Sequence, residues 1–227
     1  MKVRISTAVK MLAVAAAMVA ASGASAQSKG QLTAVFGAGK ITPHVESGNI
    51  SAPALPNSKG DVSANTQPIV VLTYGLTDNI AVETAVAPPY KHKIYGADAI
   101  SGTGELGKVQ ALPATLFVKY NFFEPNAMIR PFVGVGATYA YFFKETGSFK
   151  MTSLTNPGGS VPTTFSIDNK FTYSAQAGVN VSFSERLFAS ATFVKTKLRT
   201  DVHFSTGQYQ HMKLDPSTVI LGIGYKF

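Results

Sequence analysis

The chain has 227 residues, of which 45% are hydrophobic and 14% charged, with no cysteine, no tryptophan and a formal net charge of +8. Without cysteine it can form neither a disulfide framework nor a cysteine-based metal site. Its basic residues form no continuous block and are not interleaved with aromatic residues, so nucleic acid is not an expected partner.

The first 26 residues have the pattern of a secretory signal peptide. Lys2, Arg4 and Lys10 precede the apolar run MLAVAAAMVAA, and Ala24-Ser25-Ala26 supplies a small-x-small cleavage site. The run is shorter than the roughly 20 residues that a membrane-spanning helix needs, and no longer apolar run follows. We therefore expect cleavage of residues 1–26 and a single domain over residues 27–227, whose net charge is +5 because the signal carries three lysine or arginine residues and no acid.

After the signal, hydrophobic residues alternate with a period of two, which is typical of strands. In residues 171–182, FTYSAQAGVNVS, one face is apolar and the other polar or small. The predicted strands, in chain order, cover residues 31–42, 66–75, 80–90, 112–122, 131–143, 171–182, 187–200 and 214–227.

The connections between these strands alternate in length. Short turns fall at 76–79, 123–128 and 184–186, and long polar or glycine- and proline-rich loops fall at 43–65, 91–110, 144–170 and 201–213. This layout predicts an all-β fold, an eight-stranded antiparallel up-and-down transmembrane β-barrel. A soluble barrel with an apolar ligand cavity is the rival interpretation.

Two observations favour the membrane interpretation. The face opposite the apolar one is rich in Gly, Ser, Thr, Gln and Asn and poor in charge, which suits a narrow lumen. Aromatic residues gather near strand ends, where their rings would lie at lipid headgroups. The expected members of these girdles are Tyr74, Tyr90, Tyr120, Tyr139, Tyr141 and Tyr225.

The parity opposite the lipid-facing one places large apolar side chains inside the predicted barrel. They are Ile69, Val71, Phe117, Phe132, Phe142, Phe188, Val194, Leu198 and Ile220. Such a lining favours a passage for apolar solutes, but an eight-stranded barrel is also narrow enough for these side chains simply to fill it. The residue pattern leaves both alternatives open.

Charged residues are few on the predicted strands. Glu83 and Lys119 share the lumen parity of neighbouring strands and are expected to pair, as a structural closure or as a proton or ion relay. Lys195, Lys197 and Arg199 lie on the lipid parity towards a loop, where they would contact lipopolysaccharide phosphates or simply extend a solvated strand.

No catalytic or metal-binding pattern is evident. His44, His92, His203 and His211 lie in or beside long loops and are expected to be solvated. No serine lies in a nucleophile-elbow pattern. We predict no enzymatic activity, no metal and no cofactor.

The chain ends on the strand VILGIGYKF, whose bulky residues share one parity. This strand is expected to close the barrel against the first strand. Tyr225 and Phe227 are interfacial aromatics on its lipid face, and the terminal phenylalanine resembles the signal that the outer-membrane assembly machinery recognises.

Specific segments resemble the outer membrane protein W family, whose relatives include an alkane-uptake protein. The most specific are TDNI (77–80), KHKI (91–94), LPATL (112–116), RPFVGVG (130–136) and LDP (214–216), and the resemblance covers all eight predicted strands.

The resemblance implies an integral barrel of the bacterial outer membrane with extracellular long loops and periplasmic termini. It also implies passive uptake of small hydrophobic molecules through an apolar lumen that opens sideways into the membrane. Pro113 is a candidate for this lateral opening, because proline lacks the donor that a closed ladder uses. The alternative is a surface receptor or adhesion scaffold that acts through its loops and has a plugged lumen.

Overall fold

The structure is a computed structural model, and it describes residues 29–52, 54 and 56–227. The predicted signal peptide, residues 1–26, lies outside the described residues. Among the residues that the structure describes, no helix has the length and hydropathy needed to cross a membrane.

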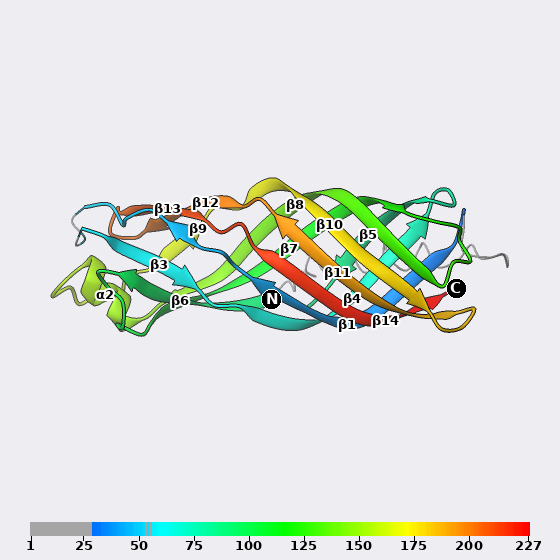
Figure 1. The fold of residues 1–227 in the computed structure, drawn as a ribbon. Helices are drawn as coiled ribbons and strands as arrows, with labels where there is room; N and C mark the ends of the chain where they lie inside the picture. The colour runs from blue at the N-terminus through cyan, green and yellow to red at the C-terminus, as the bar shows by residue number, and fades with distance from the viewer. Residues whose placement is uncertain (1–28, 53, 55) are drawn as a thin grey trace, which may run out of the picture.

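Eight antiparallel strands close into a barrel (Figure 1). They are β1 (Leu32–Thr42), β4 (Asn65–Gly75), β5 (Ile80–Val86), β7 (Glu105–Asn121), β8 (Ile129–Gly147), β10 (Lys170–Ser182), β11 (Leu187–Thr196) and β14 (Ser217–Lys226). The last strand pairs with the first, from Thr33 opposite Lys226 to Thr42 opposite Ser217. The predicted all-β barrel and its closing strand are confirmed.

Three short turns and the end of β14 lie at one end of the barrel, which we call the turn end; the other is the loop end (Figure 1). The long connections at the loop end, expected only as polar loops, contain regular structure. They hold β2 (Glu46–Ser47), β3 (Ser58–Val62), β6 (Tyr90–Asp98), the helix α2 (Phe149–Thr155), β9 (Phe165–Ile167), β12 (Arg199–Phe204) and β13 (Tyr209–Lys213). A separate sheet has the order β2-β13-β12-β9.

Several predicted strand limits are therefore wrong. The fourth predicted strand begins at Glu105 rather than at residue 112, and the fifth continues to Gly147. The loop-end strands form because they bury apolar side chains in a cluster that they share with the barrel strands, and hydrophobic burial stabilises them. Members contributed by the long connections include Ile50, Ile100, Leu106, Met151, Phe165, Val202, Phe204 and Met212.

The outer wall carries the predicted apolar face. Large hydrophobic side chains that stay exposed include Phe36, Leu116, Val118, Val133, Val135, Phe193, Val219, Leu221 and Ile223. Aromatic pairs flank this band: Tyr225 and Phe227 pack edge to face at the turn end, and Tyr139 and Phe171 pack at 4.6 Å towards the loop end. An exposed apolar band between aromatic girdles is the surface that lipid requires.

Tyr90 is the exception among the predicted girdle residues. It is only 3% exposed and points into the barrel. The reason is a break between β5 and β6 at Pro88 and Pro89, across which the inside parity changes: Ala81 and Glu83 are buried in β5, whereas Tyr90 and His92 are buried in β6. The prediction extended the alternation of residues 80–90 past the two prolines and therefore assigned Tyr90 to the lipid face, which is wrong.

Gly224 makes room for an aromatic ring inside the barrel. It pairs with Phe188 of β11, and a Cβ at position 224 would lie 2.1 Å from the Phe188 ring. We expect Gly224→Val to lower the free energy of unfolding by about 1–3 kcal/mol, because overpacking forces rings off their rotamers. Urea unfolding in phospholipid vesicles measures the loss. Ala38→Val, on the exposed face of β1, is the matched control, and equal effects of the two changes would contradict this account.

Candidate functional site

All nine predicted lumen residues are buried, and none is more than 9% exposed. Eight of them divide between two apolar clusters, and Phe132 belongs to neither. Phe142 and Leu198 join the loop-end cluster, which the barrel shares with the long connections. A second cluster in the barrel contains Val35, Ile69, Val71, Phe117, Phe188, Val194 and Ile220.

The larger cavity of the barrel, about 190 Å³, lies within this second cluster. We call it the lateral cavity. Its apolar lining comes from opposite walls: Ile69 and Val71 on β4, Phe117 on β7, Val194 on β11 and Ile220 on β14. Glu83 and Gln176 also line it.

The lateral cavity extends to a gap in the barrel wall. Strand β7 pairs with β5 only as far as Leu116 opposite Thr84, and its pairing with β6 begins at Ala111 opposite Tyr90. In the part of the chain that the structure describes, residues 85–89 and 112–115 form no ladder with each other. Residues 84–87 and 112–115 all line the cavity.

Prolines account for the missing ladder. Pro88 and Pro89 interrupt one edge and Pro113 lies on the other, and none of them has an N–H to donate. Pro113 remains opposite Ala140 of β8, so β7 stays attached on its other side. The structure therefore places Pro113 at an edge of the gap.

A second cavity of about 80 Å³, which we call the upper cavity, lies towards the loop end. Phe142, Leu198 and Leu214 contribute to its apolar lining, together with Ile94 and Met212 from the long connections. It adjoins the lateral cavity, because both are lined by Ile41, Pro113, Thr196 and Thr218. Apolar side chains thus line two adjoining cavities, one towards the loop end and one at the wall gap.

A chain of hydroxyl groups crosses four strands near the junction of the two cavities. Thr115 and Thr138 lie 2.8 Å apart, and Ser174 lies 2.7 Å from both Thr138 and Thr196. These hydroxyls satisfy one another, so polar side chains are present without leaving unpaired groups in an apolar lumen. No sequence pattern identifies this chain, because its members come from β7, β8, β10 and β11.

The predicted ion pair forms on the turn-end side of the lateral cavity. The Lys119 ammonium lies 2.6 Å from Glu83 Oε2, and both side chains are less than 10% exposed. Thr73 Oγ1 also donates to Glu83 Oε2 at 2.7 Å, and Gln176 Nε2 donates to Oε1 at 3.0 Å. The Lys119 ammonium also lies 4.1 Å from the centre of the Phe132 ring. The carboxylate therefore has three side-chain donors, which offset its burial.

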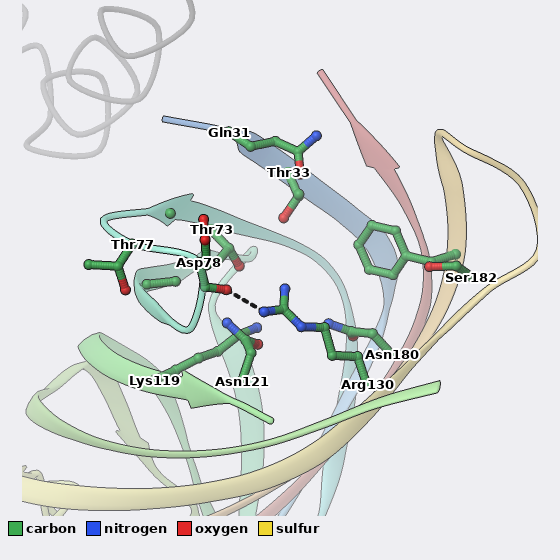
Figure 2. A pocket seen from close by; sticks show the side chains of 13 residues that line it. Gln31, Thr33, Thr73, Thr77, Asp78, Lys119, Asn121, Arg130, Asn180 and Ser182 are labelled. Carbon is green, nitrogen blue, oxygen red and sulfur yellow. Dashed lines mark hydrogen bonds between the residues drawn. The ribbon is translucent and has the colours of Figure 1, made fainter. Parts of the chain in front are cut away.

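A small cavity of about 10 Å³ lies beside the ion pair and is lined by Val71, Thr73, Glu83 and Lys119, among others. The polar network itself lies between the lateral cavity and a turn-end cavity of about 60 Å³, which Figure 2 shows. Glu83 lines the former and Lys119 the latter. Figure 2 shows the polar side chains that surround the turn-end cavity, with Arg130 bonded to the Asp78 carbonyl. Arg130 Nε also donates to the Phe122 carbonyl at 3.3 Å.

Two predicted lumen residues lie on the turn-end side of the ion pair. Phe188 lines the polar turn-end cavity, and Phe132 packs against the Lys119 ammonium and lines neither apolar cavity. Parity placed both residues inside the barrel correctly, but it carries no information on depth. Phe132 therefore packs against the polar closure, and Phe188, although it belongs to the second apolar cluster, faces the turn-end cavity rather than the lateral cavity.

The predicted basic residues lie outside the barrel. Lys195 donates to the Asp215 carbonyl and to Ser217 Oγ, and the Lys197 ammonium lies 5.6 Å from the centre of the Tyr173 ring. Arg199 is exposed at the start of β12. Tyr225 and Phe227 lie on the outer face of β14 at the turn end, as their parity predicts.

The histidines do not all behave as expected. His203 and His211 lie in the exposed part of the loop-end sheet, but His92 is only 5% exposed and lines the upper cavity. The expectation of a solvated His92 is wrong because β6 extends the barrel wall at this position and, beyond the proline break, points even-numbered residues inwards. Among the described residues, no group of three or more His, Asp or Glu side chains is arranged to hold a metal ion.

Comparison with known proteins gives consistent matches. The model of the OmpW family matches residues 28–227. Outer membrane protein W of Vibrio cholerae is 31% identical over 190 residues, which cover 78% of this chain and 85% of that protein. Outer membrane protein AlkL of Ectopseudomonas oleovorans is 26% identical over 204 residues, 88% of this chain and 83% of that protein.

Solved structures have the same fold. The crystal structure of OprG from Pseudomonas aeruginosa superposes with a TM-score of 0.78 at 22% identity, covering 89% of this chain and 98% of that one. The solid-state NMR structure of AlkL in DMPC bilayers gives a TM-score of 0.68 at 24% identity, covering 91% of this chain and 94% of that one.

Proposed function

This chain belongs to the OmpW family of outer membrane proteins, and from that premise and its geometry we propose that it is a passive channel for small hydrophobic molecules. One observation carries the proposal: the apolar upper and lateral cavities adjoin, and the lateral cavity extends to a gap in the barrel wall. An apolar solute meets almost no polar group that would have to lose its hydrogen bonds along this route.

The proposed path begins among the long loops, which lie outside the cell while the termini lie in the periplasm. A solute passes Phe142 and Leu198 in the upper cavity. It then crosses the lateral cavity between Val194, Ile69 and Val71 and leaves between residues 85–89 and 112–115. No bond is made or broken on this path, so no catalytic residue is required.

The lateral exit is favoured over an axial one by the polar network beneath it. An apolar molecule moving along the barrel axis would have to squeeze through a cavity of only about 10 Å³ beside the pair, or displace the Lys119 ammonium from Glu83, before it entered the polar turn-end cavity. Breaking a buried ion pair in this way is costly. The wall gap instead leads from the cavity into lipid without breaking a hydrogen-bonded ladder.

Two further roles belong to the proposal. Lys195, Lys197 and Arg199 are available on the outer surface towards the loop end, where lipopolysaccharide phosphates would meet basic side chains. The chain ends on a half-buried Tyr225 and an exposed Phe227, in keeping with a signal for the outer-membrane assembly machinery.

The alternative, a receptor or adhesion scaffold, would place function in the loop-end sheet of β2, β13, β12 and β9. The observation that favours it is that this sheet is ordered and presents exposed groups such as Tyr209 and His211. The same connections, however, supply Ile94 and Met212 to the upper cavity. Replacing the exposed groups alone would abolish a receptor function and leave hydrophobic uptake unchanged.

Blocking the wall gap tests the lateral exit. The chain lacks cysteine, so Ala87→Cys introduces one thiol on the gap side of the lateral cavity. Modifying this thiol with a bulky reagent is expected to lower protein-dependent uptake of radiolabelled decane in cells to background, because the label occupies the exit.

Leu221→Cys, carrying the same label, is the matched control. Leu221 is exposed on β14, away from the gap, so its label should leave uptake unchanged. Normal uptake through barrels fully labelled at position 87 would exclude exit at this gap. This experiment does not test the apolar lumen, which is tested by replacing Val71.

A further inference from the structure

His92 is a buried imidazole in a cavity that is otherwise lined by apolar side chains and a few hydroxyl groups. It is only 5% exposed, and it lines the upper cavity beside Ile94, Val109 and Met212. No charged side chain among the described residues lines this cavity. A buried imidazole in such surroundings needs a structural or a functional reason.

The main chain fixes the orientation and tautomer of the ring. His92 Nδ1 lies 2.7 Å from the Ser63 carbonyl oxygen, which only accepts, so Nδ1 carries the proton. Ser63 is itself held by the neighbouring residue, because its N–H donates to the Lys93 carbonyl and its Oγ accepts from the Lys93 N–H, both at 2.9 Å. The imidazole is therefore held in one orientation.

Burial favours the neutral form of the ring. His92 lies at the loop end, on a level where the outward side chains are Lys91, Lys93 and Lys108, beyond the apolar band of the barrel. Burial lowers the pKa of His92 below its ordinary value, more than the bond to the Ser63 carbonyl raises it. With Nδ1 protonated, Nε2 of the neutral ring has a lone pair and accepts hydrogen bonds.

Nε2 has no hydrogen-bond partner among residues 29–52, 54 and 56–227. Three threonine hydroxyls in the cavity are already engaged: Thr138 and Thr196 bond to Ser174, and Thr200 donates to the Asp168 carbonyl. A solute in the upper cavity that carries one hydroxyl would thus find an acceptor already oriented for it.

We propose that His92 selects, among hydrophobic solutes, those that carry a hydroxyl donor, by accepting a hydrogen bond at Nε2 in the upper cavity. This inference rests on the proposed channel function, since it assigns a preference to the same path. An ether of similar size cannot satisfy Nε2, because an ether oxygen has no hydrogen to donate.

The test compares 1-decanol with decyl methyl ether, titrated into the full barrel in phospholipid nanodiscs. Methyl resonances of Ile41 and Met212 report occupancy, and the Nε2 resonance of ¹⁵N-labelled His92 reports the hydrogen bond. We expect the alcohol to bind about two- to tenfold more tightly than the ether, the range that one net hydrogen bond supplies. The Nε2 resonance should move with the alcohol and stay in place with the ether.

Variants separate selection from a purely structural role. In His92→Phe the preference for the alcohol over the ether should fall to about one. Partitioning of the two compounds into lipid is the same with wild type and variant, so a change in the preference reports the loss of the imidazole. In Ile94→Ala, which enlarges the same cavity without changing its polarity, the preference should persist. His92→Gln keeps a donor for the Ser63 carbonyl and an acceptor for the solute, so it should retain part of the preference.

Two failures are distinguishable. If both compounds bind equally to the wild-type barrel, or if His92→Phe keeps the preference, the role of His92 is excluded while the channel proposal stands. If neither compound moves any lumen resonance, the channel proposal itself fails. The Nε2 resonance is measured in the wild-type barrel, so it tests the hydrogen bond from the alcohol to His92 even if His92→Phe does not fold.

Discussion

Replacing Val71 by arginine is expected to reduce protein-dependent uptake of decane to the level of cells that lack the protein. Val71 is 8% exposed and lines the lateral cavity, which lies on the proposed path from the upper cavity to the wall gap. An arginine there fills the cavity, and its charge retains water. Transfer of an apolar solute into such a space is no longer favourable in free energy. The measurement is the initial uptake rate of radiolabelled decane at concentrations where the deletion strain is limited.

Two controls accompany this change. Val71→Met alters volume but not polarity and should retain part of the uptake, whereas Ser205→Arg adds the same charge on the exposed loop-end surface and should retain all of it. Val194→Arg repeats the block from β11 on another wall. Folded barrel levels must be equal in all strains. Unchanged uptake in both lumen variants would refute a passage and favour an interior that is merely filled.

Replacing Lys119 by methionine is expected to lower the free energy of unfolding by about 3–5 kcal/mol, because it leaves Glu83 as a buried carboxylate without a counter-charge. Glu83 keeps only the neutral donors Thr73 and Gln176 after this change. Urea unfolding in phospholipid vesicles, followed by circular dichroism, gives the loss.

The double variant Glu83→Gln with Lys119→Met should recover most of that stability, since no unpaired charge remains. Additive effects of the two single changes would mean that the ion pair of 2.6 Å contributes no coupling. Decane uptake in the double variant should stay close to wild type, because the pair lies below the wall gap. Loss of uptake at full stability would instead indicate a path through the polar network.

The transmembrane strands could be predicted because lipid and lumen impose opposite requirements on alternate residues. This local pattern identified the outward residues of β14 and the inward positions of Val71, Val194 and Ile220, and it identified Glu83 and Lys119 as a pair. The pattern fails where the chain stops being a regular strand. Pro88 and Pro89 change the inside parity, and the prediction therefore misplaced Tyr90 and His92.

The loop-end structure escaped prediction for a related reason. Strands β9, β12 and β13 are three to six residues long, and each buries only a few apolar side chains. A pattern of that length is hard to distinguish from a loop, and it becomes a strand only because neighbours from distant parts of the chain complete the sheet and the cluster.

By itself, the sequence determined the barrel, its closing strand, the lipid-facing residues and the apolar character of the lumen, because each depends on residues two apart in one strand. Only the tertiary structure decided which lumen residues share a cavity, where the ladder along β7 is interrupted, and that the Glu83–Lys119 pair lies between the apolar cavities and the turn end. These features depend on depth along the barrel and on pairing between strands distant in sequence. The period-two alternation predicts only the face of a strand on which a residue lies.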